Sequence, residues 1–212
     1  MELTGLWGAF YRVSLIISKL AYVNVLWILF SLAGLILLGV APATVALFSV
    51  TRAWARKEWD IPVFQTFWSV YKQEFWKASG SSAILFGVGF LLYWNFTLFA
   101  GGGATELVIR GILLIVTVFF AGMLLLYFPT YVSFRLNGFG RVRAALLLAC
   151  GHPYHLVCMV VGLYLLQFIF MFIPGLLLFF AVASAAYLLS WLSEKIFASI
   201  KKKHELQQEV TS

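Results

Sequence analysis

The sequence predicts an all-α fold: a polytopic helical membrane bundle of about five transmembrane helices, with amphipathic helices on the cytoplasmic side. Composition is the first reason, because 63% of the 212 residues are hydrophobic and only 11% are charged, against roughly 45–50% and about 25% in soluble domains. The second reason is that long uncharged runs alternate with short basic segments. So few charges could not cover the surface of a soluble protein, and a soluble enzyme is excluded.

The number of spans follows from the stretches without Asp, Glu, Lys or Arg, which are 20–51, 78–105, 111–134 and 144–193. A spanning helix needs about 20 largely apolar residues, so each of the first three stretches holds one span. The last holds two, because Ile173-Pro174-Gly175 is a natural tight turn. We therefore expect one integral membrane domain over 1–212, with a cytoplasmic tail at 194–212 and spans near 22–40, 81–100, 111–132, 155–172 and 175–192.

The first uncharged run carries a break at Gly39-Val40-Ala41-Pro42. Proline and glycine both disfavour a continuing helix. Residues 39–57 are therefore either a kinked extension of the first span or a separate interfacial helix, and the sequence leaves both open.

The distribution of basic residues predicts the orientation in the membrane. Of the 15 Lys and Arg residues, twelve fall in segments on one predicted side, and three fall on the other, namely Arg12, Lys19 and Arg110. Because short cytoplasmic loops carry the excess of Lys and Arg, we expect a multi-pass protein of the cell membrane with its C-terminus cytoplasmic and its N-terminus outside. The net charge of +7 is therefore explained by basic loops at the surface of the lipid bilayer. Nucleic acid is not expected as a partner.

Two amphipathic helices are predicted outside the spans, at 3–20 and 61–79. In the second, Asp60 is a good N-cap and Gly80 is well placed to end the helix. Aromatic side chains at helical spacing form one stripe, which consists of Phe64, Phe67, Trp68, Tyr71 and Phe75. Such a stripe packs either on its own bundle or against a helix of a partner membrane protein. The first is favoured, because helical aromatic stripes usually pack within their own protein.

The predicted spans contain no charged residue. Charges inside a bilayer usually mark ion or proton pathways, so a proton-coupled pump and an intramembrane hydrolase are disfavoured, and no catalytic residue or cofactor is expected. The few polar residues are explained by interhelical hydrogen bonds. The alternative is a path for a neutral solute, which requires Asn24, Asn95 and Gln167 to face a common cavity.

Cys150, His152, His155 and Cys158 bring two thiols and two imidazoles within nine residues. These are metal ligands in general, but Pro153 interrupts the segment and the spacing matches no established zinc motif. A position at the headgroup boundary is therefore favoured over a metal site, and the sequence leaves both open. Two cysteines also provide no disulfide framework of the secreted kind.

Two prolines are expected near the cytoplasmic ends of spans, Pro42 and Pro129. Each removes a backbone hydrogen bond and frees a carbonyl that a nearby group must satisfy. Thr44 and Thr130 follow directly and could supply the hydroxyl. A kink that shapes the bundle is the favoured interpretation over a gating hinge.

A family resemblance rests on four runs: Asn24-Val-Leu-Trp27-Ile-Leu-Phe, Gly39-Val-Ala-Pro42-Ala-Thr44-Val-Ala-Leu-Phe48, Arg52-Ala-Trp54, and Phe67-Trp-Ser-Val-Tyr-Lys-Gln-Glu-Phe75. With these runs the chain resembles the YesL family of integral membrane proteins of Gram-positive bacteria, over residues 10–192 and most specifically over 24–79. The resemblance implies genes placed beside carbohydrate ABC transporters and sensor kinases. It implies no catalytic residue.

Taken together, the expectation is a non-enzymatic accessory or assembly partner of a carbohydrate uptake or sensing system. Its partner would be a sugar ABC transporter permease or a sensor kinase. The alternative is a small transporter or channel for a neutral solute, and the sequence does not indicate an oligomeric state. The candidate partner-contact or motif residues are Asn24, Trp27, Pro42, Thr44, Arg52, Phe64, Phe67, Tyr71, Phe75, Pro129 and Thr130.

Overall fold

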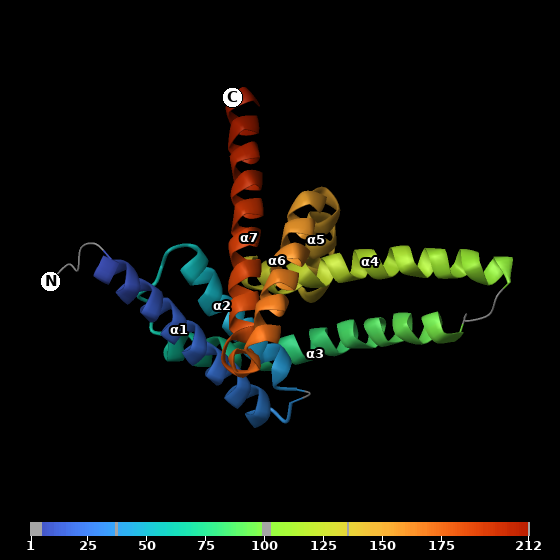
Figure 1. The fold of residues 1–212 in the computed structure, drawn as a ribbon. Coiled ribbons are helices and arrows are strands. Elements are labelled where there is room, and N and C mark those ends of the chain that lie inside the picture. Colours follow the sequence, from blue (N-terminus) through green and yellow to red (C-terminus); the bar gives the residue numbers. More distant parts are fainter. Residues whose placement is uncertain (1–5, 37, 99–102, 135, 212) are drawn as a thin grey trace.

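The computed structural model describes residues 6–36, 38–98, 103–134 and 136–211, and all regular structure in these residues is helical (Figure 1). The helices are α1 (Leu6–Ala33), α2 (Val40–Ala55), α3 (Val63–Leu98), α4 (Ala104–Ser133), α5 (Gly138–Gly151), α6 (Pro153–Phe172) and α7 (Pro174–Thr211). The predicted all-α membrane bundle is therefore confirmed.

Five helical segments are long and apolar enough to cross a membrane, which agrees with the predicted number of spans. They are Ser14–Ala33, Val63–Leu98, Ala104–Ser133, Pro153–Phe172 and Gly175–Lys201. The protein is accordingly a multi-pass membrane protein. The bounds of the first two spans differ from those predicted, and each difference has a local cause.

The first span ends at Ala33, not at residue 40. A tight turn follows, in which Leu35 and Ile36 have φ values of 58° and 59°. Gly34 and Gly39 close this turn: a Cβ on Gly34 would lie only 2.3 Å from the Cα of Gly39. The two glycines therefore allow a backbone approach that no other residue permits, and the chain reverses direction.

Residues Val40–Ala55 form the separate helix α2, so the kinked extension of the first span is excluded. The helix is not interfacial, however. Ten of its 16 residues are buried, and α2 contacts α1, α3, α4 and α7. An apolar helix without charges over its first three turns is best buried at the centre of a bundle, and α2 forms the middle of the core.

Helix α3 runs unbroken for 36 residues, so the prediction that a helix ends at Gly80 is wrong. The predicted amphipathic helix at 61–79 and the second predicted span form one element. A glycine inside a helix costs about 1 kcal/mol relative to alanine. Leaving backbone N–H and C=O groups unpaired in a membrane costs several kcal/mol each, so the helix continues.

The long antiparallel hairpin of α3 and α4 projects away from the other helices (Figure 1). The first part of α3 and the last part of α4 pack on α2, while their far halves extend from the bundle. Helix α5 packs on α4, and α6 packs on α7. Helix α7 leaves the bundle in a different direction from the hairpin (Figure 1).

The start of α1 and the end of α2 lie on the same side of the bundle. Lys19 Nζ donates a 2.6 Å hydrogen bond to the carbonyl oxygen of Trp59, in the turn between α2 and α3. The predicted distribution of charge placed Lys19 opposite Arg52, Arg56 and Lys57. In the structure Lys19 instead lies close to that segment, because α2 runs back along α1.

Candidate functional site

The residues of the first family run hold α1 against its neighbours. The buried Asn24 donates from Nδ2 to Leu178 O at 2.8 Å and accepts from Ala183 N at 2.9 Å, both in α7. Trp27 Nε1 donates to Thr44 Oγ1 at 3.0 Å. These bonds bridge helices, as expected for polar side chains inside a membrane bundle.

The end of α2 is tied to α7 and α4 through Arg52. Its Nε lies 2.7 Å from Glu194 Oε1, and its Nη1 donates to Val132 O at 3.2 Å. One residue earlier, the hydroxyls of Thr51 and Ser190 lie 3.0 Å apart in a fully buried position. Arg52 is therefore a structural cation that holds three helices together.

The aromatic stripe of α3 packs on its own bundle, as favoured from the sequence. Phe67 is completely buried, and its ring centroid lies 5.3 Å from that of Phe30 in α1. Tyr71 lies 5.0 Å from the same ring and donates its hydroxyl to Phe30 O at 3.0 Å. Phe75 packs on Tyr71, whereas Phe64 stays about half exposed at the edge of the stripe.

The two prolines occupy different positions. Pro42 lies in the first turn of α2, where no intrahelical N–H bond is lost. The carbonyl four residues earlier, Leu38 O, accepts a 2.7 Å bond from Ser79 Oγ of α3. The Thr44 hydroxyl donates to Val40 O at 2.7 Å.

Pro129 lies inside α4, and its own carbonyl accepts a 2.6 Å bond from Ser133 Oγ. The buried hydroxyl of Thr130 has no hydrogen-bond partner in the described part of the chain. Thr130 therefore does not supply the hydroxyl that the sequence suggested.

The three polar residues that the solute-path alternative requires to face a common cavity lie in separate places. Asn24 is buried between α1 and α7, Asn95 donates to Leu91 O within its own helix, and Gln167 is exposed on α6. The His/Cys segment also forms no constellation: Cys150 is exposed, and across the described residues no group of three or more His, Cys, Asp or Glu could hold a metal ion.

A polar cavity of about 270 Å³ lies where the end of α4 and the start of α5 meet α2 and α3. Its polar lining consists of Ser49, Gln73, Glu74, Tyr131 and Arg141. Tyr131 donates its hydroxyl to Glu74 Oε2 at 2.7 Å, and the guanidinium of Arg141 lies 3.6 Å from the centroid of the Tyr131 ring. Sequence patterns did not predict this cavity, because its residues come from four helices with no common spacing.

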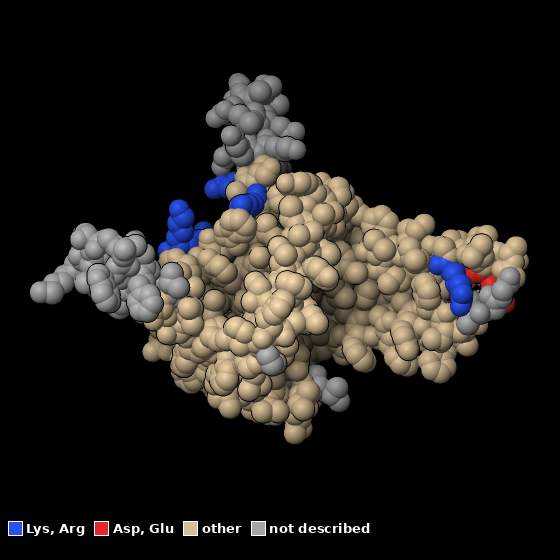
Figure 2. Space-filling model, in the orientation of Figure 1, with Lys and Arg blue, Asp and Glu red and all other residues tan. Residues whose placement is uncertain are grey.

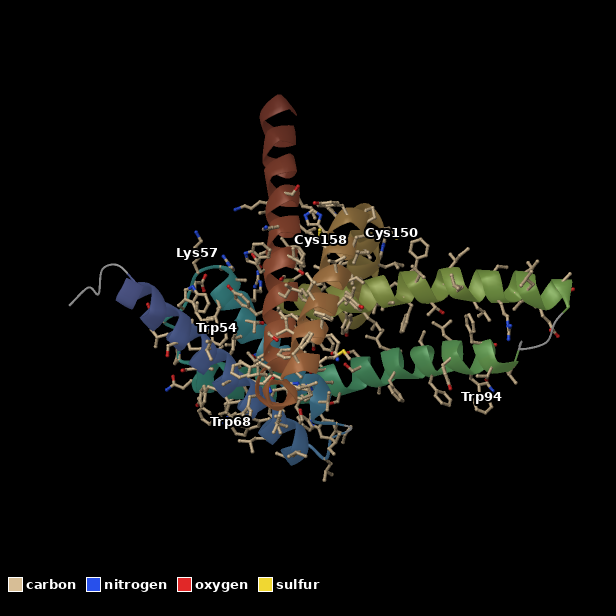
Figure 3. All side chains as sticks on the ribbon, in the orientation of Figure 1. Trp54, Lys57, Trp68, Trp94, Cys150 and Cys158 are labelled. Carbon is tan, nitrogen blue, oxygen red and sulfur yellow. The ribbon has the colours of Figure 1, made fainter. Side chains whose placement is uncertain are left out.

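Two apolar grooves flank the contact between α3 and α4 in the projecting hairpin. They measure about 480 and 490 Å³, and both include Gly89, Tyr93 and Phe120. Figure 2 shows that the visible face of the hairpin is uncharged until its tip, where Lys or Arg and Asp or Glu side chains gather. Figure 3 places Trp94 on the far half of the hairpin, well away from Trp54 and Trp68.

Comparisons with known proteins identify the family. The family of proteins of unknown function DUF624 matches residues 20–96. The chain is 33% identical over 187 residues to the uncharacterized protein YteU of Bacillus subtilis, covering 88% of this chain and 84% of YteU. It is 31% identical to the uncharacterized protein YesL of the same organism, covering 91% of each chain. The chain belongs to the DUF624 family.

A third relative, the uncharacterized protein YesV, is 28% identical to this DUF624 protein and covers 89% of the chain. No solved structure matches this chain. The family match covers the second half of α1, the buried helix α2 and nearly all of α3. The predicted resemblance to the YesL family is confirmed.

Proposed function

We propose that this DUF624 protein is a non-enzymatic accessory or assembly partner of another integral membrane protein, and that it docks through the far halves of α3 and α4. The projecting hairpin is the observation that carries this proposal. In the most apolar 18-residue stretch of α3, 6% of the residues are buried, compared with 28% in the corresponding stretch of α7. Phe86 is 76% exposed, and Ile84, Leu107 and Ile112 are similarly exposed.

The packing within the hairpin supports docking over a purely lipid-facing role. Helices associate in a membrane mainly through van der Waals packing, and the two grooves beside Gly89 and Phe120 leave that packing incomplete. The grooves are lined almost entirely by apolar and aromatic side chains. Such a surface suits the side chains of another transmembrane helix.

The class of partner follows from the family resemblance. A sugar ABC transporter permease or a sensor kinase of a carbohydrate uptake or sensing system is the partner that this resemblance implies. The candidate partner contacts Phe67 and Tyr71 pack on Phe30 of α1, so the proposed contact lies on the other half of α3. The solute-path alternative is not favoured, because Asn24, Asn95 and Gln167 share no cavity.

We also infer that both ends of the described chain lie on the cytoplasmic side of the cell membrane. Helices α1 and α2 are antiparallel, so α1 starts on the side where α2 ends. This placement requires α2 to cross the bilayer in addition to the five long apolar segments, and the four spans that follow α2 then return the chain to that side. Of the cations in described helices, this arrangement leaves Arg110 on the other side, in keeping with the positive-inside rule.

The proposal is tested by purifying the tagged protein from its native membrane in a mild detergent and identifying co-purifying proteins by mass spectrometry. The hairpin variant is Phe86→Ala with Phe90→Ala, and the control is Phe168→Ala with Phe172→Ala on α6. Both pairs are exposed phenylalanines one helical turn apart. A permease or kinase recovered with the wild type and the control, but lost from the hairpin variant, supports the proposal. Equal recovery with both variants overturns it.

A further inference from the structure

The polar cavity at the junction of α2, α3, α4 and α5 contains a cation without an anionic partner. Arg141 contacts the face of Tyr131, and among the described residues no carboxylate lies within ion-pair distance of its guanidinium. Its Nε is buried, and no acceptor for that N–H is present in the described part of the chain. A buried donor without an acceptor is destabilising, so the position is suited to a bound group.

The other charges at the cavity are already matched. Glu74 accepts the hydroxyl hydrogen of Tyr131 at 2.7 Å, and Lys77 Nζ lies 4.0 Å from the second oxygen of the same carboxylate. Arg52, which bonds to the carbonyl of the lining residue Val132, is paired with Glu194. Arg141 therefore supplies the uncompensated positive charge of this cavity.

We propose that the cavity binds a phosphate group, with Arg141 as its charged ligand and the Ser49 hydroxyl and the Gln73 amide as neutral donors. A guanidinium presents several N–H groups in a fork that matches phosphate oxygens. The volume of about 270 Å³ is just below the roughly 300–1,000 Å³ of pockets for drug-sized ligands. It accommodates a headgroup but no acyl chain.

The phosphate could come from a phospholipid headgroup or from a soluble phosphate ester. The cavity lies at the end of α4 and the start of α5, beside the middle of α2 and close to the basic residues Arg52 and Arg141. Anionic lipids gather against basic residues at the cytoplasmic surface, and soluble phosphates reach the same position from the cytoplasm. Both sources present the same group to Arg141.

The experiment measures binding to the full-length protein in a neutral detergent. Native mass spectrometry detects retained phosphatidylglycerol, with phosphatidylcholine as the comparison lipid, and thermal unfolding is followed with and without inorganic phosphate. The variant is Arg141→Gln, and the control is Arg143→Gln, an exposed cation on the same helix. Gln73→Leu tests a neutral donor at an exposed position and is not expected to disturb folding.

Arg141→Gln should weaken binding at least about tenfold, the effect of losing one charge-assisted hydrogen bond, while Arg143→Gln leaves it unchanged. Loss of phosphatidylglycerol from Arg141→Gln identifies a lipid headgroup as the source. Stabilisation by phosphate that Arg141→Gln abolishes, without lipid retention, identifies a soluble source. Gln73→Leu should weaken either signal by a smaller factor. Equal binding by wild type, Arg141→Gln and Gln73→Leu, or binding of neither probe, would overturn the proposal.

Discussion

Lys19 and Trp59 meet across 40 residues of sequence: the lysine donates to the tryptophan carbonyl at 2.6 Å, and its ammonium lies 5.9 Å from the centroid of the indole ring. The same indole stacks on Trp54 and contacts Tyr187. Trp59 thus joins the end of α2 to the middle of α1 and to α7. This contact fixes the direction of α1 relative to the rest of the chain.

Cysteine labelling should place both ends of the chain in the cytoplasm. In a background with Cys150→Ser and Cys158→Ala, we expect Glu2→Cys to react with a membrane-impermeant maleimide only after the cells are permeabilised. Gly103→Cys, at the hairpin tip, should react in intact cells. Labelling of Glu2→Cys in intact cells would show that α1 and α2 do not form the hairpin described here.

Replacing Gly34 should destabilise the protein, because any side chain at this position would point at the backbone of Gly39. Gly34→Ala places a methyl group 2.3 Å from the Gly39 Cα, and overpacking of this kind typically costs about 1–3 kcal/mol. Gly80→Ala is the control, since a Cβ there meets no atom within 4 Å. Alanine should stabilise α3 by up to about 1 kcal/mol. Thermal unfolding in detergent should therefore shift in opposite directions for the two variants.

Asn24→Ala should loosen α1 from α7. Two interhelical hydrogen bonds are lost, and such bonds are worth about 0.6 kcal/mol each on average and at most about 1.7. We expect a loss of roughly 1–3 kcal/mol in the free energy of unfolding. Asn95→Ala removes a bond within one helix and should change stability by less than about 0.5 kcal/mol. Similar losses for both variants would contradict the bridging role of Asn24.

The Arg52–Glu194 pair should show measurable coupling. Both side chains are about one quarter exposed and their atoms lie 2.7 Å apart, whereas Arg56 and Glu58 are about half exposed and 3.7 Å apart. A double-mutant cycle with Arg52→Gln and Glu194→Gln should give a coupling energy of about 1–2 kcal/mol, between the values for exposed and buried pairs. The same cycle on Arg56 and Glu58 should give less than about 0.5 kcal/mol. Equal coupling in the two cycles would refute the assignment.

The fold class and the number of long spans could be predicted, because both depend on hydropathy alone. The path of residues 34–55 could not, since it depends on how closely Gly34 approaches Gly39 and on the burial of α2 by four neighbouring helices. A short apolar helix after a predicted span gives no periodic signal that separates a crossing from an interfacial segment. No sequence pattern therefore indicates that Lys19 lies beside Trp59.

The candidate site was predictable only in part. Helical spacing identified the aromatic stripe around Phe67, and the favoured packing on its own bundle is confirmed. The polar cavity was missed, because Glu74, Tyr131 and Arg141 are brought together by tertiary packing alone. The exposure of the far halves of α3 and α4 was not predictable either, since exposure is a property of the assembled bundle.

Site-specific photocrosslinking tests the docking account most directly. A photoreactive phenylalanine analogue is placed at Phe86 or Phe119 on the hairpin, and at Phe172 on α6 as the control, all of them exposed positions. Irradiation of native membranes should join both hairpin positions to one and the same membrane protein, with no such product from Phe172. Adducts only to lipid or to a second copy of this chain, or equal adducts from Phe172, would contradict the account.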